Sequence, residues 1–147
     1  MKRISRCLYS LQQDLEIRSS FDALTSLLNR GRFFTMAGEI AKNSSSDEYI
    51  VLCLFDLDGF KQINDKLGHQ MGDKAIQIAS EQIIKGFQID FGEKWDFVDK
   101  AISEHLSFAG RLGGDEFVVF LRGRKNRKEV VAEAQNILDS LASIRVG

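Results

Sequence analysis

An unbroken apolar run, YIVLCLF at residues 49–55, ends abruptly at the acidic residue Asp56. A half-buried strand alternates apolar and polar side chains, and a membrane helix needs roughly 18 apolar residues, so the run fits neither. Its length and composition predict a strand that is buried on both faces inside a helix-covered sheet. Since ligands commonly bind at the ends of such strands, Asp56 is the first candidate functional residue.

A second acidic group lies in a predicted hairpin near the end of the chain. Apolar residues at 106–111 and 116–122 predict two strands, and Gly113 and Gly114 between them favour a tight turn because both can adopt positive φ. Asp115 and Glu116 come directly after these glycines. The pair is either an ordinary solvated turn or, together with Asp56, a site for Mg²⁺, which one or two carboxylates and substrate phosphates usually bind.

The acidic segment DLDG at 56–59 has two other interpretations. It resembles the start of a calcium-binding EF-hand, but that loop needs glycine at its sixth position and glutamate at its twelfth. Here glycine is fourth and the twelfth position is Leu67, so an EF-hand is rejected. Asp58 can instead serve as the N-cap of a helix that begins around Gly59.

Helical spacing of apolar residues predicts further elements at 31–42, at 74–85 and after 126. The residues expected to face inward from the first of these helices are Phe33, Phe34, Ala37, Ile40 and Ala41. In segment 86–100, charges and two glycines separate Phe87, Phe91, Trp95 and Phe97. We expect an irregular, partly buried insertion there, leading to a short helix near 98–105.

The first 20 residues predict a separate helix. Ile4, Leu8, Leu11 and Leu15 are spaced four, three and four residues apart, as in the seam of a coiled coil. Two interpretations stay open for residues 1–20. They form either a signalling or dimerisation helix that pairs two subunits, or an amphipathic helix that packs on its own domain.

Charge and composition exclude some partners. The 147 residues carry a formal net charge of −1, which gives no overall attraction to nucleic acid or to an anionic membrane. No apolar run approaches the length of a membrane helix, so direct membrane insertion is not expected. The two cysteines, Cys7 and Cys53, are far apart in sequence and predict a reducing, cytoplasmic setting instead of a disulfide scaffold.

Four motifs follow one another along the chain: DALTSLLNR at 22–30, DLDGFKQIND at 56–65, GHQMGD at 68–73 and RLGGDEF at 111–117. Together they resemble the GGDEF family over residues 20–145. The resemblance implies an α+β fold like the palm domain of nucleotidyl cyclases and polymerases, with a central, mainly antiparallel sheet flanked by helices. It assigns residues 21–147 to the GGDEF domain, in which we expect the family's C-terminal strands and final helix to be lacking.

The resemblance also implies an activity. Two such domains would meet as an antiparallel homodimer, each holding one GTP, and would act as a diguanylate cyclase that forms cyclic di-GMP and pyrophosphate. The alternative is a non-catalytic GTP-binding or dimerisation module that regulates a partner. A polymerase-like palm domain acting on nucleic acid is disfavoured by the near-neutral charge.

Roles for individual residues follow from the same resemblance. Mg²⁺, or Mn²⁺ in its place, is expected at Asp56, the backbone carbonyl of Leu57, Asp115 and Glu116. Arg111 is a candidate for stabilising charge in the transition state.

Six further residues are expected to bind the nucleotide: Gly113 and Gly114 along it, Phe60 and Lys61 beside the triphosphate, and Asn64 and Asp73 against guanine. A carboxylate suits guanine because the base presents adjacent N–H donors that one carboxylate can accept together.

One regulatory motif of the family differs here. Many diguanylate cyclases contain an inhibitory RxxD motif that five residues separate from the first glycine of the signature; at the first and last positions of that motif this chain has Glu104 and Ser107. Glu104 should repel the phosphate of a cyclic dinucleotide. The chain is therefore predicted to lack product inhibition through that site.

Overall fold

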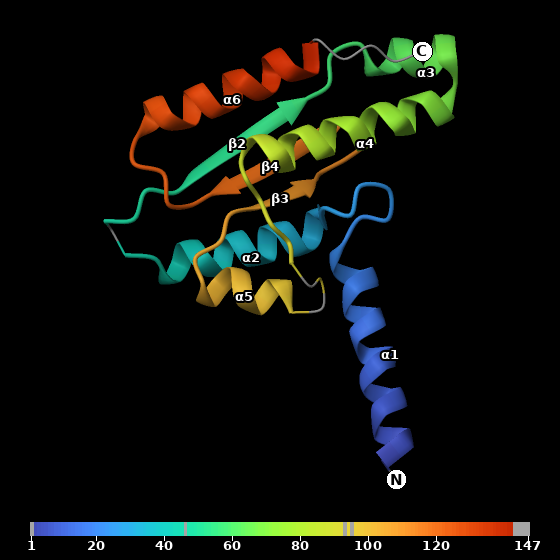
Figure 1. Cartoon of the computed structure of the whole chain (residues 1–147), viewed down its shortest axis with the longest axis vertical. Coiled ribbons are helices and arrows are strands. Elements are labelled where there is room, and N and C mark those ends of the chain that lie inside the picture. The colour runs from blue at the N-terminus through green and yellow to red at the C-terminus, as the bar shows by residue number, and fades with distance from the viewer. Residues whose placement is uncertain (1, 46, 93, 95, 143–147) are drawn as a thin grey trace.

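The computed structural model describes residues 2–45, 47–92, 94 and 96–142 of the chain (Figure 1). In chain order the elements are α1 (Lys2–Ser20), β1 (Leu28–Asn29), α2 (Arg30–Asn43), β2 (Val51–Asp56), α3 (Phe60–Leu67), α4 (His69–Gly86), α5 (Phe97–Ser103), β3 (Phe108–Arg111), β4 (Glu116–Leu121) and α6 (Arg127–Ala142). None of the helices in these ranges is both long and apolar enough to cross a membrane.

The strands form one mixed sheet in the order β1-β3-β4-β2. β1 runs parallel to β3, while β3 with β4 and β4 with β2 pair antiparallel. The predicted α+β fold with a mainly antiparallel sheet flanked by helices is therefore confirmed. The two-residue strand β1 is not predicted from the sequence, because so short a segment has no periodicity to reveal it.

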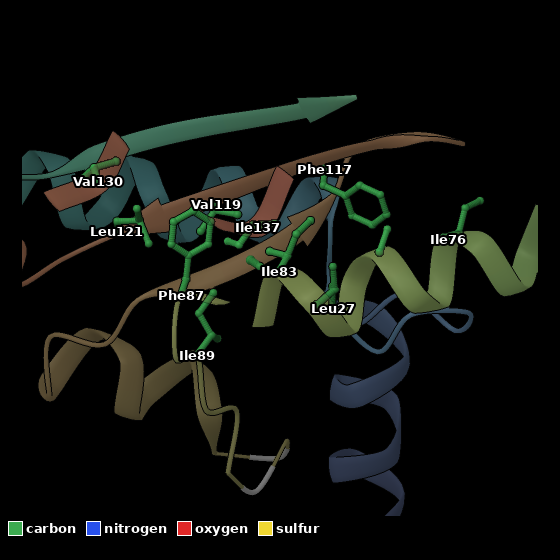
Figure 2. Packing of buried hydrophobic residues seen from close by; sticks show 12 residues of the cluster. Leu27, Ile76, Ile83, Phe87, Ile89, Phe117, Val119, Leu121, Val130 and Ile137 are labelled. Carbon is green, nitrogen blue, oxygen red and sulfur yellow. The ribbon is translucent and has the colours of Figure 1, made fainter. Parts of the chain in front are cut away.

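Strand β4 contributes to hydrophobic cores on both faces of the sheet, since successive side chains of a strand point to opposite faces. Phe117, Val119 and Leu121 pack with helices α4 and α6, a core that Figure 2 shows at close range. Val118 and Phe120 pack with α2 and α5 instead. Figure 1 shows the two pairs of helices on opposite sides of the sheet.

The prediction that the run at 49–55 forms a strand is confirmed by β2, but the prediction that both its faces are buried is wrong. β2 pairs with β4 and is an edge strand of the described sheet. Cys53 and Phe55 are partly buried against the core with α6, whereas Leu52 and Leu54 are 50% and 69% exposed. The strand that is buried on both faces is β4.

The predicted helices at 31–42 and 74–85 correspond to α2 and α4. On α2, Phe33 and Ile40 are buried as predicted, but Phe34 is 44% exposed and Ala41 is exposed, so the prediction is wrong for these two. The buried stripe of a helix repeats every three or four residues, and Met36 occupies the intervening buried position.

The insertion at 86–100 is partly buried and leads into α5, as predicted. Phe87 and Phe97 are fully buried, and the rings of Phe91 and Phe97 lie 4.7 Å apart between centroids. Trp95 lies outside the described residues. Phe87 belongs to the core with α4 and α6, Phe97 belongs to the core with α2 and α5, and Phe91 packs against both.

Helix α1 extends away from the body of the domain (Figure 1). Its end reaches the domain, where Ile17 packs against the core and Ser20 is buried. Leu8, Leu11 and Leu15, by contrast, are between 58% and 64% exposed. The side chain of Ile4, the first residue of the predicted seam, lies outside the described part. The three leucines therefore remain available to a partner, and pairing through them stays a prediction.

Candidate active site

Asp56, Asp115 and Glu116 meet at one end of the β2–β4 pair. Asp56 ends β2 directly opposite Glu116, the first residue of β4. The N–H of Leu57 donates to the carbonyl oxygen of Asp115 at 3.1 Å and so joins the two segments. The sheet therefore brings together acids from separate strands, which is the arrangement that the sequence predicts.

The carboxyl of Asp56 is surrounded by negative charge. The charge of Asp115 is the largest factor that raises the pKa of Asp56, followed by desolvation, a hydrogen bond between the two side chains, and the charges of Glu116 and Asp58. Among the described residues, no Lys or Arg forms an ion pair with Asp56, Asp115 or Glu116. Such uncompensated repulsion is relieved when a cation binds between the acids.

The donor atoms of this group match the chemistry of Mg²⁺. That ion prefers oxygen ligands, and one or two carboxylates usually hold it together with water and substrate phosphates. In the part of the chain that the structure describes, no three His, Cys, Asp or Glu side chains are gathered as a complete metal site. The carboxylates of Asp56, Asp115 and Glu116 are oxygen donors of the kind that bind Mg²⁺ together with water and phosphate.

Gly113 and Gly114 lie at the tip of the hairpin, but not for the predicted reason. The loop spans residues 112–115 and closes through the Leu112 N–H, which donates to the Glu116 carbonyl oxygen at 2.9 Å. Neither glycine has a positive φ, so the prediction of a tight turn that requires it is wrong. Apart from each glycine and its two chain neighbours, no described atom lies within 4 Å of the place where a Cβ would stand. Both therefore leave open space that a ligand can approach.

Arg111, at the end of β3, holds this loop in shape. Its guanidinium donates to the carbonyl oxygens of Gly113 at 3.1 Å and Gly114 at 2.9 Å. It also forms an ion pair with Asp22 at 3.3 Å. A role in stabilising transition-state charge would require the guanidinium to exchange some of these partners, and that role stays a prediction.

Asp22 and Thr25 complete the support of Arg111. The Asp22 carboxylate accepts hydrogen bonds from the Thr25 backbone N–H at 2.9 Å and from its hydroxyl at 2.8 Å. Burial alone would raise the pKa of Asp22, but the bonds from Thr25 and the nearby Arg111 lower it overall. The sequence predicts no role for this pair, because its contact with Arg111 joins distant parts of the chain. The local signal is the D-x-x-T spacing, which is typical of side chains that bond to nearby backbone.

Helix α3 starts directly after the acidic segment. Its N-cap is Gly59, with a φ of +78° and no capping bond from a side chain, so Asp58 does not cap this helix. Phe60 is half-buried and, with Asp56, lines a cavity of about 330 Å³. Lys61 is exposed. The structure therefore places the predicted triphosphate-binding pair on the first turn of a helix that begins beside the acids.

Asn64 lies on α3 where this helix packs against the start of α4. Its Oδ1 atom is buried and has no hydrogen-bond partner among the described residues. The same atom approaches Gly72 so closely that a Cβ on that glycine would overlap it. Asp73, the next residue of α4, is exposed. The two predicted guanine-binding residues thus come from adjacent helices.

Glu104 and Ser107 precede β3, at the opposite end of that strand from Arg111. Glu104 is the exposed C-cap of α5. The Ser107 hydroxyl oxygen accepts hydrogen bonds from the Arg122 backbone N–H at 2.9 Å and from the Arg124 guanidinium at 3.0 Å. Ser107 therefore ties the start of β3 to the segment after β4.

Comparison with known proteins identifies relatives of the chain. The sequence profile described as "Diguanylate cyclase, GGDEF domain" matches residues 19–89. Over 122 residues the chain is 31% identical to the diguanylate cyclase DgcS of Shewanella oneidensis, a match that covers 82% of this chain and 36% of that protein. It spans between 12% and 16% of four other similar curated proteins, so it corresponds to one part of these longer relatives.

Solved structures share the fold. A sensory box/GGDEF family protein from Caulobacter crescentus is 29% identical, with a TM-score of 0.63 over 87% of this chain and 72% of that one. The GGDEF domain of DgcB from the same organism, solved in complex with c-di-GMP, is 26% identical, with a TM-score of 0.68 over 87% of this chain and 66% of that one. With its ordered motifs, its fold and these matches in agreement, the chain belongs to the GGDEF domain family.

Proposed function

We propose that this chain is the catalytic domain of a cytoplasmic diguanylate cyclase that condenses two GTP into cyclic di-GMP and two pyrophosphates. In each of two transfers, the 3′-oxygen of one GTP bonds to the α-phosphorus of the other, the bond to pyrophosphate breaks, and the hydroxyl proton is released. Closing the ring requires two nucleotides to face each other. Two copies of the domain, each with one GTP, provide that arrangement.

The observation that carries the proposal is the meeting of Asp56, Asp115 and Glu116 beside two glycines with open space around them. Mg²⁺, or Mn²⁺ in its place, would be held by these carboxylates and the Leu57 carbonyl together with the triphosphate. When bound, it supplies charge neutralisation at the α-phosphate and activation of the attacking hydroxyl. The repulsion that raises the pKa of Asp56 supports this role, because a cation would relieve it.

Other residues of the chain orient the nucleotide. The first N–H groups of a helix are free to bind phosphate, and Phe60 and Lys61 begin α3 close after Asp56. Lys61 adds a positive charge near the triphosphate. Gly113 and Gly114 let the hairpin backbone lie against the nucleotide, and Arg111 keeps that backbone in shape through its bonds to both carbonyl oxygens.

Guanine recognition is assigned to Asn64 and Asp73. The carboxylate of Asp73 can accept from both N–H groups on one edge of guanine, a pattern that adenine does not present. Asn64 adds an amide from the neighbouring helix. Together they favour GTP over ATP without any contact to the phosphates.

Helix α1 is proposed to pair the two copies. Leu8, Leu11 and Leu15 are mostly exposed on a helix that extends from the domain, and exposed leucines at this spacing are typical of a coiled-coil seam. A pair of such helices would raise the effective concentration of one GTP-loaded domain for the other.

Turnover of GTP tests the proposal directly. The full chain is incubated with GTP and Mg²⁺, and products are separated by chromatography, beside an Asp115→Ala/Glu116→Ala variant. We expect cyclic di-GMP and pyrophosphate from the parent and none from the variant.

The alternatives have their own signatures in the same experiment. GTP that binds without turning over, in the presence of Mg²⁺, would favour a non-catalytic GTP-binding module that regulates a partner. Equal amounts of cyclic di-GMP from parent and variant would show that Asp115 and Glu116 are not needed for the reaction.

We also propose that the product does not inhibit the enzyme at Glu104 and Ser107. A calorimetric titration with cyclic di-GMP should show no tight binding that depends on these two residues, because Glu104 repels phosphate and Ser107 is bonded to Arg122 and Arg124. Tight binding that disappears in a Glu104→Ala/Ser107→Ala variant would contradict this.

A further inference from the structure

Gly72 lies on α4 at the point where α3 approaches it most closely. A Cβ built on this glycine would overlap Oδ1 of Asn64, lie 2.8 Å from Cγ of Asn64 and lie 3.3 Å from Cε2 of Phe60. Real Cβ atoms almost never approach a neighbour within 3.0 Å, so either Asn64 or the helix would have to move. The amide of Asn64 therefore occupies the space that any other residue at position 72 would fill.

Backbone hydrogen bonds through Gly68 also connect Asn64 to Gly72. The Gly68 N–H donates to the Asn64 carbonyl oxygen at 2.9 Å, and the Gly72 N–H donates to the Gly68 carbonyl oxygen at 3.2 Å. Gly68 has a φ of +90°, a conformation that favours glycine. Asn64 is thus linked to the start of α4 through both its backbone and its side chain.

On the basis of the proposed function, we infer that Gly72 is a positioning residue of the guanine site. By lacking a side chain, it lets the Asn64 amide lie against α4, one residue before Asp73. The spacing between the two base-reading groups is then set by this contact. Gly72 touches no substrate, and it acts through Asn64.

Two other glycines in helices provide matched controls. At Gly38 on α2, nothing beyond its chain neighbours and the adjacent backbone of its own helix lies within 4 Å of the missing Cβ, so Gly38→Ala introduces no overlap. At Gly86, the end of α4, a Cβ would overlap Cγ1 of Ile137 on α6, far from α3 in sequence. Gly86→Ala therefore disturbs packing without touching Asn64.

The test is a double-mutant cycle on the full chain, measured as nucleotide affinity with Mg²⁺ present. Titrations use 3′-deoxy-GTP and 3′-deoxy-ATP, which lack the attacking hydroxyl and so report binding without turnover. We expect Gly72→Ala to weaken 3′-deoxy-GTP binding by roughly 10- to 100-fold and to reduce the preference over 3′-deoxy-ATP, as misplacement of a site residue does. Gly38→Ala should change neither quantity, and Gly86→Ala should lower the Tm while leaving the nucleotide preference intact.

The cycle is closed with Asn64→Ala, which removes both Oδ1 and Cγ. In that background Gly72→Ala should have no further effect on 3′-deoxy-GTP affinity, because the overlapping atoms are gone. If Gly72→Ala alone fails to fold by circular dichroism while Asn64→Ala/Gly72→Ala folds, the contact is supported through stability.

Three results would overturn the inference. Losses in affinity from the two substitutions that multiply would mean that Gly72 acts independently of Asn64. An unaltered preference for guanine in Gly72→Ala, or failure of both Gly72 variants to fold, would assign the glycine to packing alone. A parent chain that binds no 3′-deoxy-GTP would remove the proposed function itself, and that result is distinct from the other three.

Discussion

Two aspartates flank the same hairpin, and their surroundings move their pKa values in opposite directions. Asp22 accepts two hydrogen bonds from Thr25 and pairs with Arg111, and the pKa of its carboxyl is lowered despite partial burial. Asp56 faces Asp115 and Glu116, and the pKa of its carboxyl is raised. One carboxylate is satisfied by the protein, and the other is placed among like charges.

The difference assigns the two aspartates different roles: Asp22 supports the hairpin loop, and Asp56 is placed to bind a ligand. Asp22 fixes Arg111, which in turn holds the carbonyl oxygens of Gly113 and Gly114, so its charge stabilises the fold of the loop. Asp56 contributes repulsion that the folded chain does not relieve. Uncompensated charge of this kind is typical of functional sites, where a ligand completes the set. Substitutions of the two aspartates should therefore change stability in opposite directions.

The largest expected effect is on turnover in Asp56→Asn. The amide keeps the shape of the side chain but removes one of the charges proposed to hold Mg²⁺, so we expect cyclic di-GMP formation to fall by roughly 100- to 1000-fold. The Tm without metal should rise, because repulsion from Asp115 is removed. Initial rates and thermal unfolding of the same preparation measure both quantities.

A matched control for this variant is Asp99→Asn, at an exposed position on α5. It should leave both the rate and the Tm close to those of the parent. A rise in Tm on adding Mg²⁺ is expected for the parent and for Asp99→Asn, and it should shrink in Asp56→Asn, since an ion that binds the folded state stabilises it. A metal-dependent shift of equal size in Asp56→Asn would argue against the proposed ligand.

The next effect in size is a loss of stability in Asp22→Ala. Removing an acceptor of charged and neutral hydrogen bonds should lower the free energy of unfolding by about 2 kcal/mol. Urea unfolding followed by circular dichroism measures it, with Asp14→Ala on the extended helix α1 as the control. An unchanged unfolding midpoint together with lost turnover would show that Asp22 acts on substrate, and the contrast with Asp56 would fail.

Much of this site is predictable from the sequence because its signals are local. Short runs of apolar residues predict the strand that ends at Asp56 and the two strands of the hairpin that contains Asp115. The order of the four motifs along the chain then predicts which residues join them at the site. What the sequence cannot predict is which strand lies at the centre of the sheet. Pairing joins distant segments, so the equally apolar β2 lies at an edge of the described sheet while β4 is covered on both faces.

The residues that sequence reasoning misses are those that act through another residue. Asp22 matters through an ion pair with Arg111, 89 positions away, and no local pattern reports that contact. Gly72 matters through the missing Cβ that admits Asn64, which only the packing of two helices reveals. Conversely, the glycines of the hairpin are conspicuous in the sequence, but the predicted reason, positive φ, is wrong.

The smallest expected effect is the pH dependence of stability, and it contrasts the two aspartates most directly. The folded-state pKa of Asp22 lies below the ordinary value of 3.8, so its stabilisation is present above that pH and is lost as the pH falls through the folded-state pKa. The folded-state pKa of Asp56 lies above 3.8, so its repulsion is present at neutral pH and is relieved on acidification before Asp22 is protonated.

Unfolding free energies are compared between pH 7 and 3 for the parent, Asp56→Asn and Asp22→Asn. Asp56→Asn should begin more stable than the parent and lose that advantage above pH 3.8, whereas Asp22→Asn should begin less stable and regain the difference below it. If the unfolding free energies of both variants converge on that of the parent over the same pH range, Asp22 and Asp56 titrate together. The two aspartates would then not have the separate roles argued above.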